Sequence, residues 1–167
     1  MNELYFFREI KKEELKAALS IIKERIRWMD EVGIKQWNVT DYEEVYPLSY
    51  YEECRERGEI FVLVEKNTED IVALGALKGT DPRWVEPKGK AFYLHHLASS
   101  PKRAGAGSIF LSLAERYAKE SGIEYFRLDS ALGNEKLEEY YTSRGYIAVG
   151  ECIDGKYIGV LREKKLS

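Results

Sequence analysis

The feature that most constrains this chain is a glycine-containing segment between a strand-like run and a helix-like run. The segment, Leu97 to Ser108, reads LASSPKRAGAGS. Glycine lets the backbone approach an anion closely, and the first turn of a helix carries N–H groups without intrahelical partners. Those donors and the positive end of the helix dipole suit a phosphate or pyrophosphate. We therefore expect an anion cradle at Gly105 and Gly107, to which Lys102 and Arg103 add positive charge.

The rest of the chain alternates between helical and strand patterns. Apolar residues at spacings of three and four form one stripe between Leu15 and Met29, which is typical of a helix. A turn pair, Asp154-Gly155, predicts a closing hairpin. We expect strands at 4–8, 59–66, 71–78, 90–99, 124–129, 146–153 and 156–161, and helices at 13–32, 47–57, 108–120 and 134–144. This order predicts one mixed α/β domain over residues 1–167, with a single sheet covered by helices.

Composition excludes several classes of protein. The chain has 167 residues, of which 44% are hydrophobic, and its net charge of −3 is not typical of a nucleic-acid binder. No apolar run approaches the ~20 residues of a membrane span, and the N-terminus has no signal-peptide pattern. The two cysteines show neither metal-ligand spacing nor a disulfide scaffold, so we expect no metal site and a cytoplasmic location.

Several interpretations of the two glycines compete. They could form a simple strand-to-helix turn that needs small residues. A P-loop needs a lysine and then Ser or Thr, but Gly107 is followed by Ser108 and Ile109. A dinucleotide fingerprint needs a third small residue where this chain has Phe110, although Asp129 imitates its acidic ribose partner. The remaining interpretation is a cradle for coenzyme A.

Two motifs in order along the chain carry a family resemblance. Residues 102–107, KRAGAG, match the pattern Gln/Arg-x-x-Gly-x-Gly/Ala, with lysine in the first place. Residues 134–146 match Asn-x-x-Ala-x-x-Leu-Tyr-x-Lys-x-Gly-Phe at Asn134, Tyr141 and Gly145. The chain thus resembles the GCN5-related N-acetyltransferase (GNAT) superfamily, specifically between about residues 92 and 150. More loosely, its N-terminal part is similar to a bacterial subset that has a Gly-x-x-Gln-Trp…Tyr-Pro segment.

The resemblance implies a mostly antiparallel, splayed sheet flanked by helices, and acetyl-coenzyme A as the cofactor. In such a protein, backbone N–H groups of the cradle hold the pyrophosphate, and the preceding strand pairs with the pantetheine arm as if with an added strand. The residues that the resemblance assigns to cofactor binding are Leu97, Ala98, Ser99, Lys102, Arg103, Ala104, Gly105, Ala106, Gly107, Ser108, Asn134 and Tyr141.

Two side chains are candidates for proton transfer. Tyr141 is the expected general acid, because a phenol of pKa ~10 is protonated at neutral pH and can protonate a leaving thiolate. The alternative is an aromatic side chain that only packs. His95 is the preferred general base, since strand alternation places it on the face of Leu97 and Ser99 and opposite His96. A hydrogen-bonded core histidine is the alternative there, with water or an acidic side chain as the base.

Four residues are expected to shape the pocket of the acetyl acceptor. They are Trp28, Gln36, Trp37 and Tyr46, in the region that the resemblance places on the acceptor side. Core packing is the alternative for the two tryptophans.

We therefore expect an N-acetyltransferase that moves an acetyl group from acetyl-coenzyme A to a primary amine of a small molecule or to an exposed protein amine. One alternative is a non-catalytic domain that binds coenzyme A as a sensor or partner. A second, motivated by Asp129, is a reductase that binds a nicotinamide nucleotide. We expect neither nucleic acid nor membrane as a partner, and a homodimer could form if the strand at 156–161 lies at a sheet edge.

Overall fold

The structure is a computed structural model that describes residues 3–166. Its strands are β1 (Tyr5–Glu9), β2 (Ile60–Glu65), β3 (Ile71–Lys78), β4 (Ala91–Ser99), β5 (Tyr125–Ala131), β6 (Ile147–Asp154) and β7 (Tyr157–Lys165). Its α-helices are α1 (Leu15–Val32), α2 (Tyr42–Val45), α3 (Leu48–Glu56), α4 (Ala106–Glu120) and α5 (Glu135–Ser143). Two 3-10 turns lie at Lys12–Glu14 and Trp37–Val39.

The strands form one mixed sheet in the order β1-β2-β3-β4-β5-β7-β6. The pairs β1–β2, β2–β3, β5–β7 and β6–β7 are antiparallel, whereas β4 and β5 run parallel. The predicted class, a mixed α/β fold with a mostly antiparallel sheet flanked by helices, is therefore confirmed.

The chain divides into two compact units, and its path passes from one to the other at the end of β3, within β4 and within α4. The first comprises residues 3–77 and 96–114, and the second comprises residues 78–95 and 115–166. His95 and His96 are neighbours in sequence but belong to different units. The expectation of a single domain stays a prediction.

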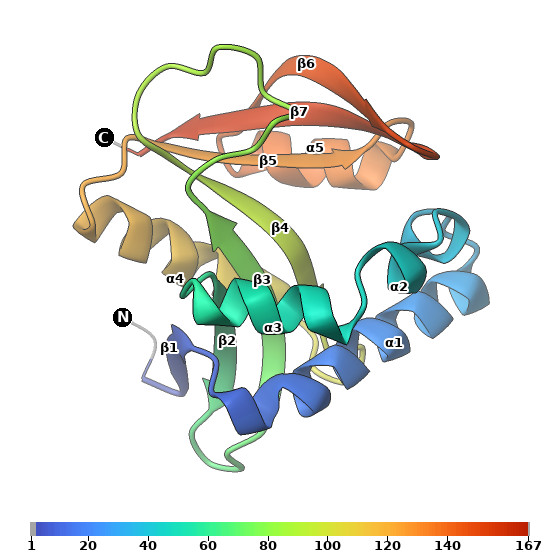
Figure 1. The fold of residues 1–167 in the computed structure, drawn as a ribbon, viewed down its shortest axis with the longest axis vertical. Helices are drawn as coiled ribbons and strands as arrows, with labels where there is room; N and C mark the ends of the chain where they lie inside the picture. Colours follow the sequence, from blue (N-terminus) through green and yellow to red (C-terminus); the bar gives the residue numbers. More distant parts are fainter. Residues whose placement is uncertain (1–2, 167) are drawn as a thin grey trace. The chain divides into compact units, whose positions relative to one another are not determined.

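The first unit is built on the apolar stripe of α1. Leu15, Ala18 and Ile22 are buried on that stripe, as the spacing predicts, and they share one core with Val62 and Leu74 of β2 and β3. Figure 1 shows α1 and α3 running beside these strands. The short elements at 37–39 and 42–45 follow no clear period in the sequence and were not predicted.

The second unit contains β5, β7, β6 and α5, with α5 against β5 (Figure 1). Here the prediction of an edge strand at 156–161 is wrong. Strand β7 lies between β5 and β6, so β6 forms the edge. Burial explains the order, because Leu161 and Arg162 of β7 are buried while β6 is exposed everywhere except Cys152. Strand β7 also continues to Lys165, which extends its pairing along β5. The homodimer stays a prediction, but a dimer through 156–161 is excluded as an edge contact.

Among the described residues, no helix is both long enough and apolar enough to cross a membrane.

Candidate active site

The predicted cradle in the first unit is a strand, a tight turn and the start of a 15-residue helix. The N–H of Arg103 donates to Ser100 O (3.0 Å) and the N–H of Ala106 donates to Arg103 O (3.2 Å). Gly105 precedes α4 with a φ of +82°, and a Cβ built there would meet no atom within 4 Å. Helix α4 begins at Ala106 rather than at the predicted Ser108, so the second glycine lies in its first turn. The surface above this turn is open, as an anion would need.

The Gly105 conformation leads to a stability prediction. For a residue with a Cβ, the left-handed region costs roughly 1–2 kcal/mol, so Gly105→Ala should lower the free energy of unfolding by about 1 kcal/mol. Gly79→Ala is the matched control, since Gly79 has no positive φ and equally open surroundings. For a chain of this length, thermal unfolding should show a Tm lower by about 2–4 °C for the first variant only. Equal Tm values for the two variants would contradict the left-handed backbone conformation assigned to Gly105.

The two cations of the cradle differ in their surroundings. Arg103 pairs with Glu65 (2.5 Å) and Asp70 (2.9 Å) on the β2–β3 hairpin, whereas Lys102 is exposed. Arg103 therefore anchors the turn to the hairpin, and Lys102 is the cation that is better placed to meet an anion.

Ser99, at the end of β4, is held by a residue that the sequence did not single out. Arg25 of α1 donates from Nε (3.1 Å) and Nη2 (2.8 Å) to Ser99 O, and from Nη2 to Ser99 Oγ (2.9 Å). A Cβ on Gly107 would lie 3.4 Å from that hydroxyl oxygen. The carbonyl expected to pair with a pantetheine arm thus already accepts from a guanidinium, although a carbonyl has two lone pairs.

His96 is enclosed by tyrosines of the first unit. Tyr42 OH bonds its Nδ1, Tyr50 OH lies 2.8 Å from its Nε2, and Tyr51 OH lies 2.6 Å from Tyr42 OH. His96 has a φ of +60°, which is uncommon for a residue with a Cβ. This conformation interrupts the alternation of side chains along β4. Alternation therefore no longer supports the prediction that His95 and Leu97 lie on the same face of the strand.

Of the four predicted acceptor residues, Trp37 and Tyr46 belong to the aromatic cluster around Tyr42 and His96, whereas Trp28 and Gln36 make other contacts. Trp37 stacks on Tyr42, with ring centroids 4.5 Å apart, and Tyr46 lies 4.5 Å from the His96 ring. Trp28 lies instead under the guanidinium of Arg25, 4.5 Å away. For Gln36 the contact is a backbone one, from its N–H to Asn38 Oδ1 (2.8 Å). Tyr42 and Tyr46 also line a cavity of about 420 Å³ between α1 and the α2–α3 segment.

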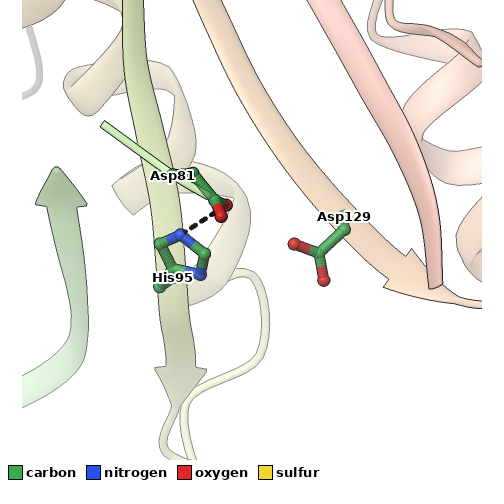
Figure 2. A group of neighbouring side chains, drawn as sticks. All are labelled: Asp81, His95 and Asp129. Atoms are coloured by element: carbon green, nitrogen blue, oxygen red, sulfur yellow. Dashed lines mark ion pairs between the residues drawn. The ribbon is translucent and has the colours of Figure 1, made fainter. Parts of the chain in front are cut away.

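In the second unit, the parallel pairing of β4 with β5 ends early. Its register runs from Ala91 opposite Tyr125 to Tyr93 opposite Arg127. Two residues further along each strand come His95 and Asp129, which face each other where the ladder has ended. Figure 2 shows the carboxyl group of Asp81 above the His95 ring and that of Asp129 to the right of it.

These three side chains form a compact group. His95 Nε2 lies 2.9 Å from Asp81 Oδ2, and one polar atom of each residue lies within 4.8 Å of the others. Asp129 accepts from Tyr157 OH (2.6 Å) and from Arg83 Nη1 (3.1 Å). Burial raises the pKa of Asp81, but its bond to His95, together with the Arg83 backbone N–H and charge, outweighs burial and lowers it below the ordinary value.

Tyr141, on α5, is a buried phenol whose hydroxyl has no hydrogen-bond partner within residues 3–166. The hydroxyls of two nearby tyrosines are already committed: Tyr146 OH donates to Glu115 (2.5 Å) and Tyr157 OH to Asp129. Burial raises the pKa of Tyr141, and the charges of Tyr140 and Asp129 add to this, so the phenol stays protonated at neutral pH. The geometry thus leaves this hydroxyl able to donate a proton.

Asn134 caps the same helix. Its side-chain oxygen accepts the N–H of Leu137 (3.2 Å), an N-cap contact that explains why helix α5 begins there.

Sequence reasoning missed Asp81 and Arg25, and among the tyrosines around His96 it singled out only Tyr46. Asp81 lies in a loop with two prolines, and Arg25 lies on a helix of mixed charge, so neither carries a local signal. The four tyrosines at 42–51 were visible as a cluster, but nothing linked them to the histidine 54 residues after Tyr42.

Comparison with known proteins identifies the family to which this chain belongs. The model of the acetyltransferase (GNAT) family matches residues 23–146, which is most of the chain. No curated protein matches the chain in sequence. The resemblance predicted from the cradle and the following helix is therefore confirmed at the level of the family.

Solved structures show the same fold. A GNAT-family acetyltransferase from Listeria monocytogenes superposes with a TM-score of 0.78 at 21% identity, covering 96% of this chain and 94% of that one. One from Streptococcus agalactiae has the same score at 17% identity, with coverages of 96% and 95%. The PaiA N-acetyltransferase of Thermoplasma acidophilum, solved with coenzyme A, scores 0.73 at 20% identity, with 99% of each chain covered.

Proposed function

The chain belongs to the GNAT family of acetyltransferases and therefore uses acetyl-coenzyme A, and from that premise we propose how its residues divide the work and what they acetylate. The acceptor is a primary amine, of a small molecule or exposed on a protein. The observation that carries the proposal is the open strand–turn–helix cradle at Gly105, which fits a pyrophosphate.

The cradle would hold the cofactor mainly through backbone groups. The first-turn N–H groups of α4 point out of the helix start, and Lys102 adds an exposed positive charge beside them. Lysine in place of the usual Gln or Arg keeps the charge and loses only the planar fork. The cofactor-binding residues Leu97 to Ser99, Lys102 to Ser108, Asn134 and Tyr141 stay part of this proposal. Arg25 joins them as the residue that fixes Ser99.

The chemistry requires a neutral amine and a proton for the leaving thiolate. Bound acetyl-coenzyme A supplies the thioester from which the acetyl group is transferred. In the second unit, His95 takes a proton from the acceptor ammonium, and Tyr141 donates its hydroxyl proton to the thiolate. The burial of Tyr141, which keeps its phenol protonated at neutral pH, supports its role. Asp81 supports the role of His95, because its carboxylate oxygen lies 2.9 Å from His95 Nε2 and would stabilise the protonated ring.

The acceptor would meet the first unit at Trp37 and Tyr46, with Trp28 and Gln36 as further pocket residues. The aromatic rings around His96 support a wall that favours a cationic or aromatic group. A cytoplasmic location also stays a proposal, in agreement with two buried free cysteines.

The reductase alternative is weakened by Asp129. Its carboxylate oxygens already accept hydrogen bonds from Tyr157 and Arg83, so a ribose hydroxyl would have to share them. The family match also favours acetyl transfer.

An acceptor screen tests the proposal. The protein is mixed with acetyl-coenzyme A and a polyamine, an aminoglycoside, a peptide with a free N-terminus or a peptide lysine, and thiol release is followed with time. We expect release above background with at least one amine class and a product heavier by one acetyl group. Release that is independent of every amine would contradict acetyl transfer to an amine. Binding of coenzyme A without release would favour the non-catalytic alternative.

A further inference from the structure

The strongest unassigned charge of the first unit is the guanidinium of Arg25, on α1. The side chain is half-buried, and burial lowers the pKa of the guanidinium from its ordinary value. An arginine nevertheless keeps its proton in a protein at neutral pH. A charge that is partly removed from water is costly unless other groups compensate it, so its contacts indicate what it can bind.

The hydrogen-bond acceptors of Arg25 are all uncharged. Nε and Nη2 donate to Ser99 O at 3.1 Å and 2.8 Å, and Nη2 also donates to Ser99 Oγ at 2.9 Å. The ring of Trp28 lies 4.5 Å from the guanidinium carbon. No carboxylate of residues 3–166 pairs with this guanidinium. The positive charge is therefore held in place but not neutralised.

Part of the hydrogen-bonding capacity of Arg25 remains. A guanidinium carries five N–H groups in a planar fork, of which two belong to Nη1. Within the described part of the chain, no acceptor contacts Nη1 at hydrogen-bond distance. One end of the fork is thus fixed on Ser99, and the other end can donate to a ligand.

The peptide between Ser99 and Ser100 shows on which side of β4 the guanidinium lies. The N–H of Ser100 donates to Val72 O on β3 (2.9 Å). This peptide is trans, so its C=O group points the opposite way. Ser99 O therefore points to the other edge of β4, whose pairing with β5 ends at Tyr93. Arg25 binds a carbonyl on the open edge of the strand.

The same serine connects Arg25 with the cradle. Ser99 Oγ accepts from Arg25, and a Cβ on Gly107 would lie 3.4 Å from this oxygen. Gly107 belongs to the first turn of α4, whose N–H groups lack intrahelical partners and favour an anion. A guanidinium without a counter-ion and the start of a helix are thus separated by one small side chain.

The two cations of the cradle itself leave a place for this guanidinium. Arg103 is already paired with Glu65 and Asp70, and Lys102 is exposed on a flexible stem. A planar guanidinium can bind two phosphate oxygens at once, which an ammonium group cannot do in a fixed geometry. Trp28 and Ser99 restrain the Arg25 fork before any ligand binds.

We propose that Arg25 is a cofactor-binding residue, which donates from Nη1 to a phosphate oxygen of the coenzyme A pyrophosphate. It supplies from α1 the planar fork that lysine at position 102 lacks. The proposal rests on the proposed role of the cradle, and it adds a direct contact to the one that Arg25 makes with Ser99.

The first test is calorimetric titration of coenzyme A into the wild-type protein and Arg25→Gln. The glutamine keeps a donor but loses the charge, so we expect the Kd to rise by about 10-fold or more. Arg27→Gln is the matched control, because Arg27 lies on the same helix, is exposed and has no ion-pair partner among the described residues. It should change the Kd by less than about twofold. Equal Kd values for Arg25→Gln and Arg27→Gln would overturn the proposal.

The salt dependence of the Kd separates a direct contact from a structural role. Added salt screens a contact between charges, so the affinity of the wild-type protein should fall as salt rises, and that of Arg25→Gln should fall less steeply. Arg25→Lys keeps the charge without the fork, and we expect a loss of about threefold with the wild-type salt dependence. The same salt dependence in all three proteins would show that Arg25 only holds Ser99, and would overturn the contact. Arg25→Lys decides the question even where Arg25→Gln does not fold.

Steady-state kinetics distinguishes the cofactor from an acceptor as the source of the anion. Under the proposal, Arg25→Gln changes the KM of an amine that carries a carboxylate no more than that of an amine without one. A KM raised only for the carboxylate-bearing amine, with an unchanged Kd for coenzyme A, would assign Arg25 to the acceptor and overturn the proposal. Failure of the wild-type protein to bind coenzyme A would refute the cradle itself. Equal binding by the wild-type protein and Arg25→Gln would refute only the role of Arg25.

Discussion

Replacing Tyr141 by phenylalanine should lower kcat by about 100-fold or more, while the affinity for coenzyme A should fall by only about twofold, because the cradle holds the cofactor mainly through backbone groups. The change removes only a hydroxyl that has no hydrogen-bond partner in residues 3–166, so it leaves no buried group unsatisfied and should cost little stability. The loss would therefore report the missing proton donor. Steady-state kinetics gives kcat, and calorimetric titration gives the affinity for coenzyme A.

Tyr140→Phe is the control for this experiment. The two tyrosines are adjacent on α5, with ring centroids 5.1 Å apart, but neighbouring helix positions point about 100° apart. Tyr140 is also less buried than Tyr141. We expect the control to keep kcat within about twofold, since the hydroxyl that it removes points in a different direction from that of Tyr141. Equal losses for the two variants, or no loss for Tyr141→Phe, would contradict the role as general acid.

The largest effect on stability is expected for Arg127→Ala. The Arg127 side chain is 3% exposed and donates to Glu163 (2.8 Å), Tyr93 OH (2.9 Å) and Lys88 O (2.5 Å). Its guanidinium also lies 4.8 Å from the ring of Tyr125. Removing one partner of a buried ion pair typically costs about 3–5 kcal/mol. Because Arg127 forms the last rung of the β4–β5 pairing, the variant should also disturb His95 and Asp129.

Thermal unfolding checks this expectation against Arg116→Ala. Arg116 pairs with Glu120 one turn away on the surface of α4, and both side chains are about half exposed or more. That pair should contribute below about 0.5 kcal/mol. We expect the Arg127 variant to lose about 6 °C or more in Tm, and the Arg116 variant to lose about 2 °C at most. Similar Tm values for the two variants would show that Arg127 does not hold the strands together.

The sequence predicted those features that depend on neighbouring residues. Gly105, Gly107 and the turn before them lie within ten residues, and helix and glycine geometry decide their shape locally. The position of Tyr141 follows in the same way from a helix that Asn134 caps and Gly145 ends. Sequence patterns of this kind predict the structure correctly because the local geometry that they favour agrees with the tertiary contacts.

Features that depend on distant contacts were beyond the sequence. Arg25 meets Ser99 across 74 residues, and Asp81 reaches His95 through a loop with two prolines. Alternation predicted opposite faces for His95 and His96, but the left-handed conformation of His96 interrupts the period there. Its hydrogen bonds to Tyr42 and Tyr50 hold that conformation, and they come from another part of the chain.

The choice of edge strand shows the same limit. The turn at Asp154-Gly155 correctly predicted a hairpin between β6 and β7. Which of the two strands pairs with β5 depends on the burial of side chains such as Arg162, which the turn does not specify.

Ligand-dependent thermal stability tests the central claim most directly. The protein is heated with acetyl-coenzyme A, coenzyme A, NADH or NADPH at matched concentrations. A ligand at ~100 times its dissociation constant stabilises the folded state by about 2.7 kcal/mol, which is a shift of several degrees in Tm. We predict that shift with the two coenzyme A forms and none with the nicotinamide nucleotides. A flat response to both coenzyme A forms, with a shift for NADH or NADPH, would contradict the cradle and the function built on it.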